Sequence, residues 1–254
     1  MANKLAVITG ASSGIGYELA KIPLAEGYDL ILAADTGIAD AATTLGGDVE
    51  TVEADLSTVE GNDALLAAIG GRTVDLLIAN AGRGLGHAFL EQEVSAWRKV
   101  IDTNVFGTTY LLHRAVPAMV ARGEGRVLIT GSIAGLIPGS CQAVYNATKA
   151  YVDSFAYALR DELVDTGVTV TVLMPGPTET PFFARAGMLD TPVGRSDSKD
   201  DAAKVAREGW DAVMSGSAHV VAGTKNKVQA AISHVTPDRV LAKMHTNMAK
   251  PDGE

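Results

Sequence analysis

Cysteine, aromatic residues and basic charge are all scarce in this sequence, and each shortage narrows the class of protein. The 254 residues include one cysteine, Cys141, so no disulfide can form within the chain, as expected in a reducing compartment. Aromatic residues make up 5% of the chain, which suits close helix-on-sheet packing better than an aromatic-rich β-sandwich. Asp and Glu outnumber Lys and Arg by 30 to 21, and the resulting charge of −9 argues against nucleic-acid binding.

Long hydrophobic runs are missing too. The first apolar run, Leu5–Ile8, is too short for the core of a signal peptide, which takes roughly 7–15 residues. No stretch approaches the ~18 apolar residues of a membrane-spanning helix. We therefore expect a cytoplasmic protein with no membrane contact. Cys141 is interpreted as a packing residue, with a redox or nucleophilic role as the alternative, because no activating group is indicated beside it.

The sequence is rich instead in short apolar runs that alternate with segments of helical period. Nearly unbroken apolar runs are typical of strands buried on both faces of a parallel sheet. Strands are predicted at 5–8, 30–33, 49–52, 76–79, 126–130 and 168–174, and long helices at about 95–121 and 143–165. This alternation predicts a single Rossmann-like α/β domain over residues 1–254, a doubly wound parallel sheet with helices on both faces.

Four segments depart from this regular pattern. Pro23 lies inside the helix predicted from Gly14, where it is expected to kink or stop the helix. Residues 36–48 leave room for only a short helix. Residues 184–200 show weak periodicity, and because long loops are usually functional or mobile, we assign a substrate loop to about 180–200. The tail, residues 250–254, is expected to fray.

A glycine-rich turn joins the first strand to the first helix, with glycines at Gly10, Gly14 and Gly16. Its spacing differs from G-x-G-x-x-G, but its place between strand and helix favours pyrophosphate binding at the helix N-terminus over a plain tight turn. Asp35 ends the second strand, where a carboxylate can bind the adenosine ribose and repel a 2′-phosphate. No Arg or Lys lies beside it, so NAD is predicted in preference to NADP, with a solvated capping Asp as the alternative.

Tyr145 and Lys149 are four residues apart on a predicted helix and share one of its faces. A nearby ammonium lowers the pKa of a tyrosine, which is otherwise near ~10 and too high for a base at neutral pH. Ser132 follows the fifth predicted strand, and such folds bind ligands at the carboxyl ends of their strands. Taken singly, the Tyr–Lys pair is commonly a surface pair and Ser132 a turn or cap residue.

Together these motifs resemble the short-chain dehydrogenase/reductase family. The resemblance depends on the order and spacing of the motifs from residue 4 to about 180, and it fades after Thr180. Its members are Thr9 to Gly16, Asp55-Leu56, Asn80-Ala81-Gly82, Asn104, Ser132, Tyr145, Lys149 and Pro175-Gly176.

The resemblance implies hydride transfer between a nicotinamide cofactor and a carbonyl or secondary alcohol. Tyr145 would be the general acid/base, Ser132 would orient and polarise the reacting oxygen, and Lys149 would bind the nicotinamide ribose. Asn104 would hold a water in a proton relay behind Lys149. The implied cofactor-binding residues are Gly10, Ser12, Ser13, Gly14, Ile15, Gly16, Asp35, Asp55, Leu56, Asn80, Ala81, Gly82, Tyr145, Lys149, Pro175, Gly176 and Thr178, and no metal is implied.

The substrate and the assembly are less closely defined. An apolar lid is predicted over a small ketone, secondary alcohol or 3-oxoacyl compound, formed by Phe182, Phe183, Met188 and Leu189. In the family the two long helices commonly pair between subunits, so a homodimer or homotetramer is expected.

Three further residues and one other function remain as alternatives. Arg83 and His87 are interpreted as solvated loop residues, although either could border the site, and Gln142 either touches substrate or is a plain wall. A catalytically idle dinucleotide sensor or scaffold is the alternative function, because a fold does not fix an activity. The complete catalytic set argues against it.

Overall fold

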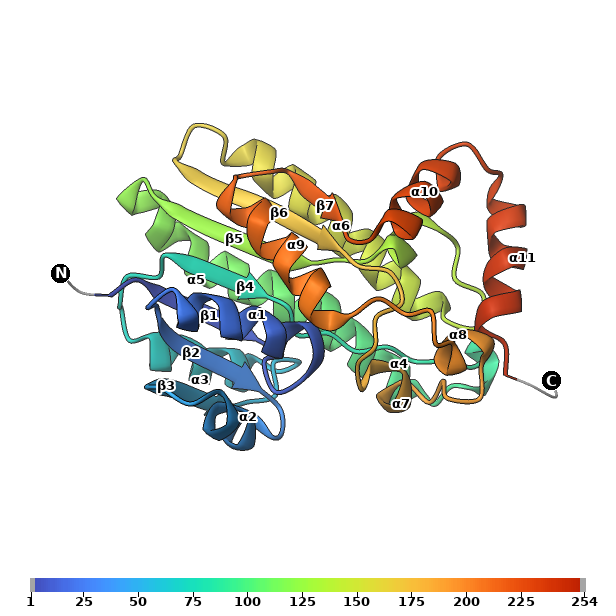
Figure 1. Cartoon of the computed structure of the whole chain (residues 1–254), viewed down its shortest axis with the longest axis horizontal. Helices are drawn as coiled ribbons and strands as arrows, with labels where there is room; N and C mark the ends of the chain where they lie inside the picture. Colours follow the sequence, from blue (N-terminus) through green and yellow to red (C-terminus); the bar gives the residue numbers. More distant parts are fainter. Residues whose placement is uncertain (1–2, 252–254) are drawn as a thin grey trace.

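A parallel β-sheet organises residues 3–251, the part of the chain that this computed structural model describes. It has seven strands in the order β3-β2-β1-β4-β5-β6-β7 (Figure 1). The strands are β1 (Leu5–Thr9), β2 (Asp29–Ala34), β3 (Val49–Glu53), β4 (Leu76–Ala79), β5 (Gly125–Thr130), β6 (Val168–Met174) and β7 (His219–Val221). The doubly wound sheet predicted from the sequence is confirmed.

Helices cover both faces of this sheet. The α-helices are α1 (Gly14–Ala25), α2 (Ile38–Leu45), α3 (Val59–Ile69), α4 (Val94–Ile101), α5 (Thr108–Arg122), α6 (Ala143–Glu162), α7 (Phe182–Arg185), α8 (Pro192–Arg195), α9 (Ala202–Met214), α10 (Thr224–Ser233) and α11 (Asp238–Ala249). Helices α1, α2 and α9 contribute to the core on one face, and α3, α5 and α6 to the core on the other. Helices α10 and α11 lie beyond the carboxyl ends of the strands (Figure 1).

The two cores explain why the strand sequences are almost unbroken apolar runs. In β2, Leu30 and Leu32 pack into one core while Ile31 and Ala33 pack into the other, so both faces of the strand are dry. The two edge strands, β3 and β7, are the exceptions, because their residues are exposed or half-buried.

The helix expected at 95–121 is interrupted, which the sequence pattern did not predict. A π-helical turn, η2 (Asp102–Gly107), separates α4 from α5. This wider turn carries Asn104, which is buried to 1% exposure. π-Turns are rare and occur frequently at functional sites.

Of three other segments, the first agrees with expectation and the other two differ from it in part. Pro23 is buried and helix α1 ends two residues after it, in keeping with an early stop. The three-residue strand β7 was not predicted. Within 184–200, α8 is helical, and Met188 packs in a small apolar cluster with Phe183, so this segment is not a structureless loop.

Two further predictions concern the segment after β2 and the C-terminal tail. The short helix expected within 36–48 is present as α2. Residues 252–254 of the predicted tail lie outside the described residues, whereas Lys250 follows α11 directly. Across residues 3–251, no helix has the length and apolar character needed to cross a bilayer.

Candidate active site

A cavity of about 440 Å³ opens at the carboxyl ends of the central strands. Its walls come from the segments that follow β1, β2, β3, β4, β5 and β6, together with α7 and α11. Every predicted cofactor-binding residue except Gly16 lines it. The topology therefore brings together motifs that are far apart in the sequence.

The glycine-rich turn forms one wall of the cavity and fits a bound pyrophosphate. Gly14 has a φ of +57°, which favours glycine, and a Cβ there would lie 3.0 Å from Thr180. Gly16 lies behind the wall, where a Cβ would overlap the carbonyl oxygen of Gly10. Ser13 is the N-cap of α1, but its side chain makes no capping hydrogen bond, so it does not occupy the N–H groups at the anion-binding end of this helix.

Tyr145 and Ser132 lie in the opposite part of the cavity. Both are buried, at 9% and 6% exposure, although both line the cavity wall. Burial raises the pKa of Tyr145 to about 12, while a hydrogen bond with Ser132 acts to lower it. Burial has the largest effect on this pKa, and the predicted lowering by Lys149 stays a prediction. The Tyr145 hydroxyl is consequently protonated throughout the neutral range.

Lys149 points its ammonium group into the same buried region. Its Nζ donates a hydrogen bond to the carbonyl oxygen of Thr130, at 2.8 Å. Burial lowers the pKa of Lys149 to about 8, and the carboxyl of Asp153 acts in the opposite direction. Lys149 is one helical turn from Tyr145 on α6, as predicted.

Asp153, which the sequence analysis did not single out, lies one further turn along α6. Its carboxyl is 5% exposed and occupies space that Cβ atoms on Gly131 and Gly135 would fill. The backbone N–H of Ser132 donates to its Oδ1 at 3.4 Å, and its buried Oδ2 has no hydrogen-bond partner within residues 3–251. Burial raises the pKa of Asp153 to about 7, opposed by Lys149. The i, i+4 spacing from Lys149 was the signal that could have identified it.

Asn104 lies behind the cavity and does not line it. Its Oδ1 accepts from the backbone N–H of Arg83 at 2.7 Å. Its Nδ2 donates to the carbonyl oxygen of Arg83 and to Thr148 Oγ1, each at 2.9 Å. The buried amide thus ties the loop after β4 to helix α6, and its place in a water relay stays a prediction.

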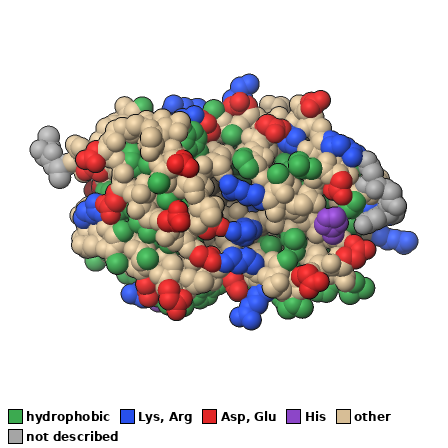
Figure 2. All heavy atoms as spheres, turned by 90° about the horizontal axis from the view of Figure 1, so that it is seen from below, with side chains coloured by type: hydrophobic (Ala, Val, Ile, Leu, Met, Phe, Trp, Pro, Cys, Tyr) green, Lys and Arg blue, Asp and Glu red, His purple; other side chains and the backbone are tan. Residues whose placement is uncertain are grey.

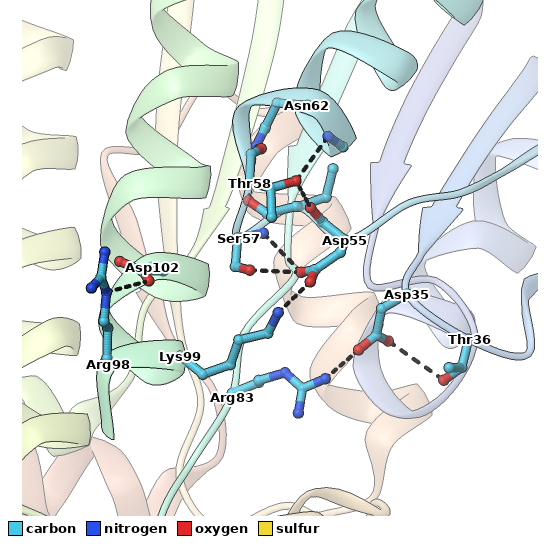
Figure 3. A network of polar contacts seen from close by, with 12 residues as sticks. Asp35, Thr36, Asp55, Ser57, Thr58, Asn62, Arg83, Arg98, Lys99 and Asp102 are labelled. Atoms are coloured by element: carbon cyan, nitrogen blue, oxygen red, sulfur yellow. Dashed lines mark hydrogen bonds and ion pairs between the residues drawn. The ribbon is translucent and has the colours of Figure 1, made fainter. Parts of the chain in front are cut away.

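Two ion pairs surround the part of the cavity assigned to the adenosine (Figure 3). Asp35 pairs with Arg83, and Asp55 pairs with Lys99 of α4. Although partial burial acts to raise it, hydrogen bonds from Lys99 and Ser57 lower the pKa of Asp55. The expectation that no basic residue lies beside Asp35 is therefore wrong, because Arg83 contacts it in the folded structure. The interpretation of Arg83 as a merely solvated residue is wrong for the same reason.

The remaining wall of the cavity is largely apolar. The ring of Phe182 lies 5.3 Å from that of Tyr145, between centroids, and Phe183 lines the wall beside it. Met188 is fully buried beneath them and Leu189 is 58% exposed, so neither lines the cavity as the predicted lid requires.

Polar groups from two segments complete this wall. Gln142 lines the cavity, and its buried Nε2 has no hydrogen-bond partner in the described part of the chain. The sequence analysis missed His245 of α11, whose Nδ1 lies 2.7 Å from the carbonyl oxygen of Ser140. Burial lowers the pKa of His245, opposed by the hydrogen bond with Ser140, and so favours the neutral ring. Nothing in the sequence pattern linked this C-terminal helix to the site.

A parallel sheet with a glycine-rich turn at its ligand-binding edge defines a nucleotide-binding protein of the Rossmann type. The chain belongs to the short-chain dehydrogenase family, whose family model matches residues 4–188. It is an oxidoreductase, in agreement with the resemblance carried by its motifs.

Relatives extend this assignment to the cofactor class. An uncharacterized oxidoreductase of Staphylococcus epidermidis is 32% identical over 183 residues, which cover 70% of this chain and 80% of that protein. A short-chain dehydrogenase/reductase of Burkholderia phymatum in complex with NAD is 26% identical, with a TM-score of 0.82 and coverage of 92% and 93%. A Sphingobium yanoikuyae short-chain dehydrogenase in complex with NADPH is 26% identical, with a TM-score of 0.79 and coverage of 91% and 94%. These complexes support binding of a nicotinamide dinucleotide.

Proposed function

We propose that this protein interconverts a carbonyl compound and a secondary alcohol with NAD(H) or NADP(H), using Tyr145 as its acid/base. The observation that carries the proposal is the meeting of Tyr145 and Ser132 at the end of a cavity whose other wall is the glycine-rich turn. A bound nicotinamide would supply or accept the hydride. The protein's task is then to position the reacting carbon and to move one proton at its oxygen.

The protonated Tyr145 hydroxyl suits donation of a proton to a carbonyl oxygen during reduction. Ser132 Oγ donates to the carbonyl oxygen of Pro175 at 3.3 Å, and can turn instead toward a substrate oxygen. The Lys149 ammonium would bind the nicotinamide ribose and favour the phenolate that forms when Tyr145 loses its proton. Asn104 would hold a water behind Lys149 and complete the proton path.

Substrate size and polarity follow from the walls around Tyr145. Phe182, Phe183 and Val193 offer an apolar surface, while the free N–H of Gln142 offers a hydrogen-bond donor. This lining favours a ketone, secondary alcohol or 3-oxoacyl compound of modest size. Taken by itself, the Asp35 carboxylate would favour NAD over NADP.

The test compares Tyr145→Phe with Tyr157→Phe, since Tyr157 is a 42% exposed tyrosine on the same helix. Purified proteins are supplied with both cofactors and a panel of ketones and alcohols, and nicotinamide absorbance is followed. Tyr145→Phe should lose about 10²–10⁴-fold in turnover while NADH binding is retained, because only the proton transfer is removed. Turnover of the variant at the wild-type rate would show the assignment to be wrong. Cofactor binding by the wild type without turnover of any compound would favour the idle sensor.

We also propose a homodimer or homotetramer. An apolar groove between α4, η2 and α6 supports it, lined by Phe89, Ile101, Val105, Ala143, Val144, Ala147 and Thr148. The half-exposed ring of Phe89 and the exposed side chain of Leu90 lie at or beside this groove. Sedimentation velocity should therefore detect a dimer or larger species, and a monomer at high concentration would contradict the proposal.

A further inference from the structure

Arg83 and Asp35 form an ion pair across two walls of the cofactor cavity. Asp35 follows β2 and Arg83 follows β4, and both side chains line the cavity (Figure 3). The side chains are 42% exposed for Arg83 and 34% for Asp35, so both remain accessible to a ligand. The carboxylate that was expected to act alone therefore has a cation as its direct neighbour.

The backbone of Arg83 is held on both sides. Asn104, itself buried, accepts from its N–H and donates to its carbonyl oxygen. The guanidinium thus projects from an anchored position and not from a free loop. Its Nη2 donates to Asp35, and its other N–H groups have no protein partner among the described residues.

A column of cations crosses one face of this protein, whose net charge is −9. Figure 2 shows Lys and Arg side chains in a column across the middle of that face, with Asp and Glu on both sides. At the adenosine end of the cavity, Arg83 and Lys99 stand against Asp35 and Asp55, so the local charges balance. An isolated carboxylate repels a phosphate group, whereas carboxylates that are paired with cations repel it much less.

We propose that Arg83 sets the cofactor specificity of this protein by offsetting Asp35 and binding the 2′-phosphate of NADP(H). The planar guanidinium has free N–H groups for a phosphate, a geometry in which arginine binds in bidentate fashion. The second oxygen of Asp35, Oδ1, accepts from Thr36 Oγ1 at 3.5 Å and can also accept from the ribose hydroxyls of NAD(H). The protein consequently accepts both cofactors. This inference rests on the proposed function, because it concerns the cofactor of the same reaction.

The experiment titrates NADH and NADPH by fluorescence into the wild type, Arg83→Gln and Asp35→Asn. The wild-type dissociation constants should lie within about tenfold of each other. Arg83→Gln should weaken NADPH binding at least ~10-fold and NADH binding less than ~3-fold, since only the phosphate contact is lost. Asp35→Asn should strengthen NADPH binding. Arg98→Gln is the matched control, because Arg98 pairs with Asp102 on α4, does not line the cavity and removes the same charge.

A second readout isolates the adenosine end. Competition by 2′,5′-ADP should weaken in Arg83→Gln, whereas competition by 5′-AMP should not change. Raising the salt concentration should weaken NADPH binding more steeply in the wild type than in Arg83→Gln. Equal effects of Arg83→Gln on both cofactors, or an effect matched by Arg98→Gln, would overturn the inference while leaving the proposed function intact. Failure of the wild type to bind either dinucleotide would overturn both.

Discussion

The two ends of the cavity hold charged groups in opposite ways. At the adenosine end, Asp35 and Asp55 each pair with a cation, and all four side chains are between a third and a half exposed. At the chemical end, Lys149 and Asp153 are buried with few partners, and their pKa values move far from the ordinary ones. Exposed pairs are screened and contribute little to stability, so they are suited to tuning affinity. Buried groups are costly to change, so they are suited to chemistry.

The test with the largest expected effect replaces one lysine at each end of the cavity with methionine and compares the turnover of the two variants. Lys149→Met removes a buried ammonium that donates to Thr130, and turnover should fall by at least ~100-fold. Lys99→Met removes an ammonium that is 35% exposed and paired with Asp55, and turnover at saturating cofactor should stay within about threefold. Steady-state kinetics measure both variants. Comparable losses in the two would contradict the distinction between the ends.

A second effect is expected in the pH dependence of stability. Native Asp153 keeps its proton until a pKa of about 7, whereas the unfolded chain releases it near 3.8. Between these values the native state binds more protons, so the free energy of unfolding falls as pH rises from about 4 to about 7. This contribution is complete below the lower value and lost above the upper one.

Asp153→Asn removes that proton and should flatten this part of the profile. The expected difference is on the order of 4 kcal/mol, because the pKa changes by about three units and each unit corresponds to about 1.4 kcal/mol. Urea denaturation at a series of pH values measures it. Asp161→Asn, at an exposed position on the same helix, should follow the wild-type profile. Parallel profiles for the wild type and Asp153→Asn would show that the carboxyl is already ionised at low pH.

The sheet was predictable because its strands are buried on both faces. Four consecutive apolar residues, Leu30 to Ala33, fill the two cores, for example. Such a run fits a strand that is buried on both faces and does not fit a helix with one apolar face. Strand β7 was not predicted, because its three residues, His219–Val221, are too few to show a hydrophobic pattern. The π-helical turn η2 was not predicted, because the apolar period of the flanking helices continues through it and the sequence shows no break in the helical pattern.

The site was predictable wherever a motif is local, as with Tyr145 and Lys149 on one helix face. It was not predictable where partners meet only in three dimensions. Arg83 and Asp35 are 48 residues apart, and only the strand order brings the loops after β2 and β4 to the same cavity. His245 reaches the cavity from the C-terminal helix in the same way.

The π-helical turn η2 also sets the rotational register between two helices. An α-helix turns by about 100° for each residue, because it has 3.6 residues per turn. A wider turn places more chain between α4 and α5 than a regular helix needs. Deleting one residue within Asp102–Gly107 would therefore restore a regular helix but swing α4 around its axis, carrying Lys99 away from Asp55. Insertions and deletions, which most surface loops tolerate, should be selected against at this buried position.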